Sequence, residues 1–458
     1  MNEKVLHVLE FDKIVQMLAE HAGSAPAKAL CSALAPMEQM EDIQRCLEET
    51  DAAIAVIFKK GSIGFGHNRD FGYTFGALSI GSSLTAADLL RLQSFLENVG
   101  RVRSYGMTDS GIGEDNILYD LFDCLDPLRP LSREIGRCIL SEEEIADDAS
   151  SALRKIRREI GQTGDRIRQQ LNKMVNVTLA SYLQDSVITM RGDRYCLPVK
   201  AEHKGQVPGI VHDQSSSGST LFIEPAAVVS LNNQLRELFL QEKKEEEKVL
   251  AYLSEQAAEN LMALKDDAAN MTALDFIFAR ASFALSMNAT KPVFNEKRRI
   301  RIRRGRHPLI DPAKVVPIDL ELGETYDMIV ITGPNTGGKT VTLKTVGLME
   351  LMGMAGLHIP AGDQSELAFF REIYADIGDE QSIEQSLSTF SSHMTQIVDI
   401  LGKADSECLC LFDELGAGTD PTEGAALAIS ILDHLHLSGV TVLATTHYSE
   451  LKVYAMRT

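Results

Sequence analysis

A glycine-rich segment at residues 333–340 matches the pattern G-x-x-x-x-G-K-[ST], which binds phosphate groups when it connects a strand to a helix. The apolar run 328–331 before it is typical of a buried strand, and residues 341–346 after it are typical of the start of a helix. Glycines let backbone amides surround a phosphate chain, and the helix N-terminus adds positive potential. This context disfavours the plain alternative of a glycine turn with a surface lysine. The pattern residues are Gly333, Pro334, Asn335, Thr336, Gly337, Gly338, Lys339 and Thr340.

The rest of a nucleotide site is predicted at a second apolar run, 409–412, which is followed by Asp413 and Glu414. Because the carboxyl ends of strands in an open α/β sheet face the ligand crevice, both carboxylates are expected beside the phosphates. Lys339 offers a charge for the β- and γ-phosphates and Thr340 a hydroxyl for Mg²⁺, while Asp413 would hold the metal through water. Glu414 is then placed to orient or deprotonate the attacking water. Solvent-exposed carboxylates after a buried strand would not explain why both follow an apolar run downstream of this loop.

Two further polar segments are candidates for the same site. His447 follows Thr446 at the end of another apolar run, 440–445, and a histidine at a strand end can donate to a γ-phosphate or position water. By itself, a histidine in such a position is more commonly a surface residue with its hydrogen bonds satisfied. Residues 379–394 are rich in serine and, by themselves, indicate a polar helix start with serine N-caps.

The pattern of apolar residues divides the chain into three regions. Residues 1–140 carry helix-period apolar residues broken by turns, which predicts an α-helical core and lever. Residues 141–295 are expected to form long helical arms, because carboxylates at 142–144 suit a helix start and a heptad seam of about three heptads follows. Between about 187 and 225 the period becomes that of four short strands, which predicts a small β clamp inserted between the arms. Residues 296–458 alternate strands with helices, which predicts an α/β P-loop domain.

The amino-acid composition constrains the cellular compartment and the kinds of partner that are expected. The net charge of −20 disfavours a protein coated with nucleic acid, although it leaves room for local basic surfaces. No apolar run of about 18 residues is present, so no membrane partner is expected. The N-terminus lacks a signal pattern. Seven cysteines without a CxxC pair indicate reduced thiols in the cytoplasm and no structural zinc site.

Three groups of basic residues are candidate nucleic-acid contacts, and each has a plain alternative. Residues 154–173 carry a basic cluster that is equally explained as the solvated face of a helix. Residues 297–304 alternate arginine and isoleucine like an edge strand with its charges outward. A third group would give the β clamp a basic edge, unless it is only a solvated hairpin surface. That group consists of Arg191, Arg194, Lys200, His203 and Lys204.

In order and spacing, these motifs resemble the ATPase of MutS-type proteins, within the ABC class. The upstream chain is similar too, with a helical core and lever, two arms with an inserted clamp, and the sequence Gly-Arg-His-Pro at 305–308 entering the ATPase. The resemblance is to the second bacterial branch, MutS-two, because the chain starts at lever-like residues 9–12 without mismatch-reading and connector domains. The ATPase motifs are the runs 332–340, 387–390, 413–419 and 446–447, together with Gln381.

The resemblance implies a nucleotide-driven homodimer with ATP and Mg²⁺ as cofactors. Glu414 would activate water and His447 would touch the γ-phosphate. Gln381 would couple the metal site to the arms. Ser388 would act in trans on the ATP of the partner subunit, and Asp420 would lie at the same dimer seam. The residues implied to hold phosphate or Mg-ATP are Asn335, Lys339, Thr340 and Asp413.

The function implied by the resemblance is an ATP-hydrolysing clamp that acts on nucleic acid or nucleoprotein. Two targets are associated with this branch: collided or stalled ribosomes, whose rRNA the arms would grip, and branched DNA, where the clamp suppresses recombination. The sequence does not decide between them. Members usually continue with further ATPase residues, a coiled segment and a Smr nuclease domain. This chain stops at Thr458 without a Smr motif, so we expect a C-terminally incomplete ATPase and no nuclease activity from it.

Two other protein classes are alternatives. A binding module with little turnover would bind the nucleotide and the target without measurable ATP hydrolysis. Steady ATP hydrolysis that vanishes in Glu414→Gln would exclude this class. ABC-class chromosome-cohesion ATPases carry far longer coiled arms than the seam found here, which disfavours that class.

Overall fold

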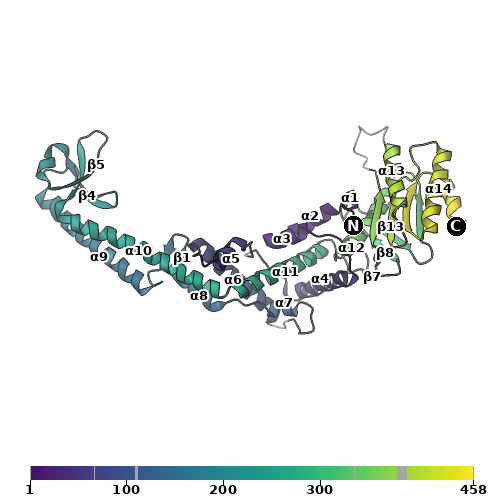
Figure 1. Cartoon of the computed structure of the whole chain (residues 1–458), viewed down its shortest axis with the longest axis horizontal. Helices are drawn as coiled ribbons and strands as arrows, with labels where there is room; N and C mark the ends of the chain where they lie inside the picture. Colours follow the sequence, from purple (N-terminus) through teal and green to yellow (C-terminus); the bar gives the residue numbers. More distant parts are fainter. Residues whose placement is uncertain (1, 67, 109–111, 335–336, 379–388, 457–458) are drawn as a thin grey trace. The chain divides into compact units, whose positions relative to one another are not determined.

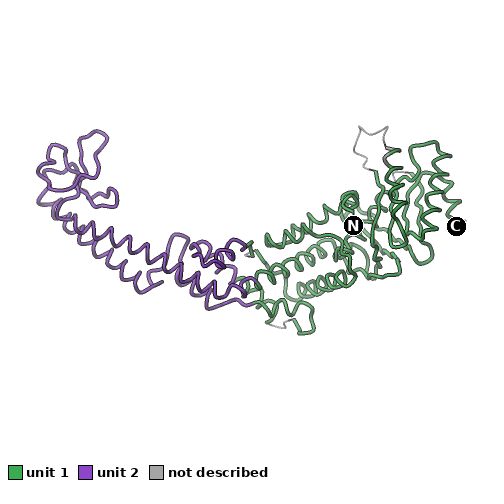
Figure 2. Tube along the Cα trace, viewed as in Figure 1, with its two compact units in different colours: residues 1–70, 98–125, 266–458 green, residues 71–97, 126–265 purple. Residues whose placement is uncertain are grey.

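The chain folds into two compact units, which Figure 2 distinguishes by colour. The computed structural model describes residues 2–66, 68–108, 112–334, 337–378 and 389–456. Unit 1 comprises Met1–Asp70, Asn98–Leu125 and Asp266–Thr458, and unit 2 comprises Phe71–Glu97 and Asp126–Lys265. Each unit therefore combines segments that lie far apart in the sequence. The three regions predicted from the sequence, with boundaries at residues 140 and 295, stay a prediction.

Amphipathic helices form the first part of unit 1. Helix α2 places Phe11, Ile14 and Leu18 at helical spacing on one face, and all three side chains are buried. Ser24 begins α3 by accepting a hydrogen bond from the Ala27 backbone N–H at 3.3 Å, as an N-cap does. The helices are α1 (Glu3–Val8), α2 (Phe11–His21), α3 (Ala25–Ser32), α4 (Met40–Lys60), α7 (Tyr119–Asp123) and parts of α6 (Ala86–Met107) and α11 (Leu261–Ser286).

A four-stranded parallel sheet in the order β10-β14-β13-β12 forms the centre of the α/β part of unit 1. Its strands are β10 (Met328–Thr332), β12 (Glu372–Asp376), β13 (Cys408–Phe412) and β14 (Thr441–Thr446). Every residue of β13 and β14 is buried, as expected for a parallel sheet covered on both faces. Figure 1 shows two of the covering helices, α13 and α14, beside β13. The helices are α12 (Lys339–Met354), α13 (Thr389–Leu401), α14 (Pro421–Leu437) and α15 (Glu450–Ala455).

Alternation along β13 assigns its side chains to two hydrophobic cores. Leu409 and Leu411 belong to the core that contains α12, whereas Cys410 and Phe412 belong to the core that contains α13 and α14. A Cβ atom on Gly347 of α12 would lie 2.5 Å from Leu411 Cδ1, so α12 packs on this sheet as closely as a glycine allows. The sheet is thereby fixed from both faces.

A second sheet of unit 1, in the order β7-β11-β8-β9, corrects one expectation. Ile300 and Ile302 are buried in alternation with arginines, as the pattern at 297–304 predicts. The prediction of an edge strand is wrong, because β8 pairs with β11 on one side and β9 on the other. Arg301 lies 2.8 Å from a carboxylate oxygen of Glu321. The strands are β7 (Val293–Asn295), β8 (Ile300–Gly305), β9 (Ile318–Leu322) and β11 (Glu366–Ala368).

Two long helices that pack along each other, α9 (Ser151–Lys173) and α10 (Ala226–Glu259), form the centre of unit 2. The predicted long helix with an apolar seam is confirmed, since Ile167, Leu171 and Leu235 share one hydrophobic core. The predicted start at 142–144 is wrong. A hairpin of β1 (Ile139–Ser141) and β2 (Glu144–Ile145) occupies that segment, and Ser150 caps α9 instead.

An antiparallel sheet in the order β3-β4-β6-β5 forms the other part of unit 2. The four predicted strands are all present. Gly192 and Asp193, between β3 and β4, both have positive φ angles of 53° and 59°, as a tight hairpin turn requires. The strands are β3 (Thr189–Arg191), β4 (Arg194–Lys200), β5 (Gly209–Gln214) and β6 (Thr220–Pro225). The remaining elements are α5 (Gly72–Ser79), α8 (Arg129–Cys138), the π-helix η1 (Met174–Thr178) and the 3-10 helix η2 (Ala201–Gln206).

The predicted fold class is confirmed: a helical region with small sheets precedes an α/β P-loop region. No helix within the described ranges is long and apolar enough to cross a membrane.

Candidate functional site

The carboxyl ends of four parallel strands meet at one edge of the central sheet of unit 1. Thr332 at the end of β10 pairs with Thr446 at the end of β14, and Asp376 at the end of β12 pairs with Phe412 at the end of β13. The phosphate-binding loop, Asp413 and the residue after Thr446 therefore leave the sheet at the same edge. This is the edge at which open α/β sheets bind ligands.

Lys339 is a buried cation at this edge. It is the first residue of α12 and is only 3% exposed. Its Nζ donates to the Gly333 carbonyl at 2.6 Å and lies 3.4 Å from both the Thr446 carbonyl oxygen and His447 Nδ1. Gly338, which precedes it, has a φ of 75°, a left-handed conformation that glycine adopts without steric cost. Within the described part of the chain, Lys339 has no anionic partner.

The surroundings of Lys339 fit a phosphate group. A buried charge is normally paired or hydrogen-bonded to an opposite charge, because transfer of an unpaired ion out of water is costly. Here the ammonium group has only uncharged acceptors among the described residues, and it stands at the N-terminus of a 16-residue helix, whose dipole also favours an anion. The residues present therefore fit the phosphates of a nucleotide.

Asp413 lies in a network of hydroxyl groups. Thr340 Oγ1 donates to Asp413 Oδ2 at 2.7 Å, and the Thr445 hydroxyl donates to the other carboxylate oxygen. The Thr445 hydroxyl also accepts from the Glu414 backbone N–H at 2.8 Å. Hydroxyl and carboxylate oxygens are ligands that Mg²⁺ prefers, so Thr340 and Asp413 fit a magnesium ion beside the phosphates.

Glu414 is held in an unusual backbone conformation. Its φ of 50° is left-handed, which is uncommon for a residue with a side chain and often marks a functional position. Its Oε1 lies 3.2 Å from His447 Nε2. Because the Lys339 ammonium can only donate, His447 Nδ1 accepts and Nε2 carries the proton directed at Glu414. Lys339, His447 and Glu414 thus form one chain of polar contacts.

Some of the other predicted site residues lie within the described part of the chain, and the rest lie outside it. In the loop, the Gly337 N–H donates to the Pro334 carbonyl at 3.1 Å. Asp420 is exposed and caps α14, accepting from the backbone N–H groups of Thr422 and Glu423 at 2.9 and 3.3 Å. Four predicted residues lie outside the described residues: Asn335, Thr336, Gln381 and Ser388.

Sequence reasoning assigned no role to three residues that the structure brings to this edge. Thr445 joins Asp413 to Glu414 through its hydroxyl group. Asp376 accepts a hydrogen bond on its backbone oxygen from the Asp413 N–H at 2.9 Å. His393 Nδ1 lies 3.0 Å from both carboxylate oxygens of Asp376. The only signal in the sequence is that Asp376 and Thr445 lie at or next to the ends of strands, which does not reveal which strands are neighbours.

Glu350 on α12 is a fully buried carboxyl group behind the site. The Ala368 N–H donates to its Oε1 at 3.5 Å, and its Oε2 has no hydrogen-bond partner among the residues described. Burial raises the pKa of Glu350 well above its ordinary value of 4.5. The folded protein therefore holds this proton at pH values where the unfolded chain has lost it.

We expect Glu350→Gln to make the protein less sensitive to alkaline pH. In the wild type, the contribution of Glu350 to stability is fully present below pH 4.5 and is lost as pH rises toward the raised pKa. Glutamine cannot ionise, so the Tm difference between variant and wild type should grow in favour of the variant as the pH rises above 4.5. The exposed Glu41→Gln is the control, and parallel pH profiles for Glu350→Gln and wild type would refute this explanation.

In unit 2, the basic cluster at 154–173 contains an arginine that is already paired. Arg157 of α9 contacts Glu242 and Glu246 of α10 at 2.7 and 2.9 Å, and it donates to the Ile145 carbonyl and to Asp147, each at 2.6 Å. Its side chain is 22% exposed. Arg157 therefore ties the two long helices together.

We expect Arg157→Ala to destabilise unit 2 by about 1–2 kcal/mol, because three carboxylates lose a partly buried partner. Hydrogen exchange should speed up in α9 and α10 and stay unchanged in the central sheet of unit 1. Arg158→Ala, on the same helix but exposed, should change neither. Equal effects of the two substitutions would contradict this role for Arg157.

Two of the five residues predicted to form a basic edge of the β clamp neutralise carboxylates within the sheet. Arg194 NH1 lies 2.8 Å from Glu224, whose side chain is fully buried, and His212 and Asn232 also contact that carboxylate. Arg191 lies over the Phe222 ring and 3.1 Å from Asp213. The prediction that Arg194 contributes to a basic edge is wrong, because Arg194 is paired with the buried carboxylate of Glu224.

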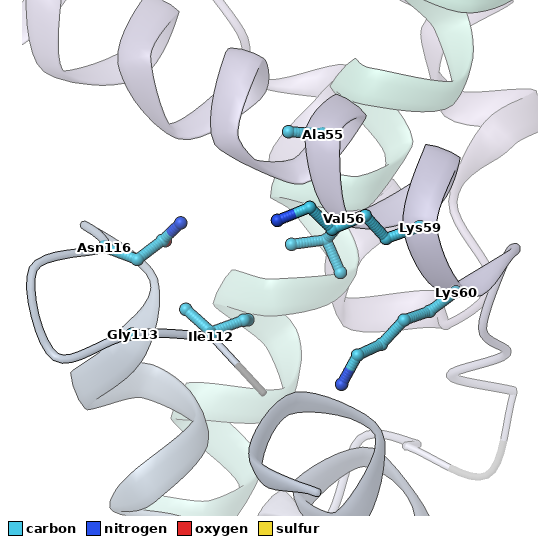
Figure 3. A pocket seen from close by; sticks show the side chains of 7 residues that line it. All are labelled: Ala55, Val56, Lys59, Lys60, Ile112, Gly113 and Asn116. Atoms are coloured by element: carbon cyan, nitrogen blue, oxygen red, sulfur yellow. The ribbon is translucent and has the colours of Figure 1, made fainter. Parts of the chain in front are cut away.

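A small pocket of about 80 Å³ lies in the helical part of unit 1, and none of its lining residues belongs to the candidate nucleotide site (Figure 3). Lys60 belongs to it, but its Nζ donates to the carbonyl oxygens of Tyr105 and Thr108 at 2.6 and 2.8 Å. That lysine therefore satisfies carbonyl groups at the end of α6. The lining residues are Ala55, Val56, Lys59, Lys60, Ile112, Gly113 and Asn116.

Comparison with known proteins connects the site to one family. A family model described as MutS domain V matches residues 329–458, a range that includes the phosphate-binding loop, Asp413, Glu414 and His447. Over the whole chain, the sequence is 56% identical to Endonuclease MutS2 of Agathobacter rectalis. It is 52% identical to Endonuclease MutS2 of Lachnoclostridium phytofermentans and 49% identical to that of Clostridium acetobutylicum. Each alignment covers 100% of this chain and 58% of the relative.

Proposed function

We propose, because this chain belongs to the MutS2 family, that it is an ATP-hydrolysing module whose nucleotide state controls a clamp on nucleic acid or nucleoprotein. Its α/β region is a MutS domain V ATPase. The observation that carries the proposal is the buried Lys339 ammonium with only uncharged partners in the described chain, next to the Thr340–Asp413 pair. The chain spans 58% of the length of the relatives named above.

Each of the described site residues has its own role in ATP hydrolysis. Lys339 binds the β- and γ-phosphates of ATP, and Thr340 and Asp413 hold Mg²⁺. When bound, the metal neutralises phosphate charge. Glu414 orients a water molecule and takes its proton while the water oxygen attacks the γ-phosphorus and ADP leaves. His447 contacts the terminal phosphate, which its position between Lys339 and Glu414 supports.

The clamp requires a second copy of the chain and a two-state equilibrium. ATP binds the closed dimer more tightly than the open one, and this difference in affinity is the energy that moves the arms. Ser388 acts in trans on the ATP of the partner, Asp420 lies at the dimer seam, and Gln381 couples the metal site to the arms. Asn335 contacts phosphate within the loop.

The target is a nucleic acid or a nucleoprotein assembly, either collided ribosomes or branched DNA. The relatives are named endonucleases; we assign no nuclease step to residues 1–458 and propose that such activity needs a Smr-type domain. Phosphate release by the purified chain tests the enzymatic part. Release that requires both ATP and Mg²⁺ supports an ATPase. Tight nucleotide binding without release would identify a binding module with little turnover.

A further inference from the structure

A histidine–aspartate pair stands beside the nucleotide site and has no place in the proposed mechanism. Asp376 ends β12, and its backbone oxygen accepts from the Asp413 N–H at 2.9 Å. The Asp376 side chain is 5% exposed, and His393 of α13 lies 3.0 Å from both of its carboxylate oxygens. The pair therefore joins α13 to the strand end next to the one that carries Asp413 and Glu414.

The charges at this edge favour a hydrogen-bond donor or a cation beside Asp376. Asp376, Asp413 and Glu414 bring three carboxylates to neighbouring strand ends, where the polyphosphate adds further negative charge. The hydrogen bond to Asp376 holds the pKa of the His393 imidazole above its ordinary value against the opposing effect of burial, and the charges of Asp376, Glu414 and Asp413 add to the rise. His393 thus places a hydrogen-bonded imidazole against the most buried carboxylate of the three.

We propose that His393 is a positioning residue for ATP hydrolysis, which acts through Asp376 to fix the strand end and the charge balance around Asp413 and Glu414. Without His393, Asp376 would be a buried carboxylate with no other side-chain partner among the described residues, and it would repel the neighbouring carboxylates and the phosphates and disturb the backbone hydrogen bond from Asp413. Outer partners of metal-binding carboxylates commonly have such effects. The inference rests on the proposed ATPase function.

The test compares single-turnover phosphate release in the wild type, His393→Gln and the double variant Asp376→Asn/His393→Gln. His393→Gln should slow release by about 10- to 100-fold. The double variant removes the unpaired charge and should recover most of the wild-type rate. His436→Gln is the matched control, because His436 lies 3.4 Å from Asp327 at the amino end of β10, at the opposite edge of the same sheet; this variant should hydrolyse ATP at the wild-type rate.

The outcomes separate this inference from the function on which it rests. If the wild type releases no phosphate, the ATPase proposal fails. If the wild type is active and His393→Gln matches it, the positioning role is refuted. A double variant as slow as the single variant would also refute it, because a contact that serves only packing is not restored by removing its second partner. Thermal unfolding of each variant identifies a rate that is low only because the protein is unfolded.

Discussion

Glu414→Gln should abolish steady ATP hydrolysis while leaving nucleotide binding intact. Glutamine keeps the size of the side chain and its contact with His447, but it cannot accept the proton of the attacking water. Loss of a general base costs about 10²- to 10⁴-fold in rate. Phosphate release should fall by that factor, while the Kd for a fluorescent ATP analogue should change little.

A matched control separates this effect from a general loss of charge. Glu423 lies in the first turn of α14, close in sequence to Glu414 but exposed. Glu423→Gln should hydrolyse ATP at the wild-type rate. If Glu414→Gln hydrolyses ATP as fast as Glu423→Gln does, Glu414 is not the base.

Lys339→Ala should remove most of the affinity for ATP. The lysine is 3% exposed, and its ammonium has uncharged partners only within the described residues, so a bound phosphate would be its sole counter-charge there. Removing one partner of a buried charged pair costs about 2–5 kcal/mol, which is roughly 30- to 4,000-fold in Kd. Titration with a fluorescent ATP analogue measures the change.

Lys344→Ala is the control for this substitution. Lys344 is also on α12, but it lies 3.4 Å from the carboxylate of Glu10 and is therefore already paired. Its removal should leave the Kd for ATP nearly unchanged. Comparable losses of affinity in the two variants would mean that α12, and not the Lys339 charge, determines binding.

Features that depend on neighbours in the sequence could be predicted from it. The loop at 333–340, the apolar runs that became β10, β13 and β14, and the heptad seam of α9 each have a local pattern. The position of Asp413 at the ligand edge could be predicted as well, because parallel strands place their carboxyl ends together. These features were enough to predict the fold class and to bring Lys339, Thr340, Asp413 and Glu414 into one site.

Features that depend on which strands are neighbours could not be predicted. The Asp376–His393 pair requires β12 to lie beside β13, and the role of Thr445 requires β14 to lie on its other side. The alternation at 297–304 is the same for an edge strand and an inner strand, and only pairing with the later β11 decides between them. Likewise, the sequence does not reveal that Arg157 and Arg194 are paired, because their partner carboxylates lie on α10 and β6, far from them in the sequence.

The proposal that nucleotide state controls the clamp is tested most directly by sedimentation of the Glu414→Gln protein. The protein is mixed with ribosomes, including nuclease-made disomes, and an equimolar four-way DNA junction, and is run with ATP, with ADP or without nucleotide. We predict that the ATP-bound protein stays with one of these targets and that the ADP-bound protein does not; the target retained identifies the substrate. Equal binding in all three conditions, or binding to neither target, would contradict a clamp of nucleic acid or ribosomes that ATP closes.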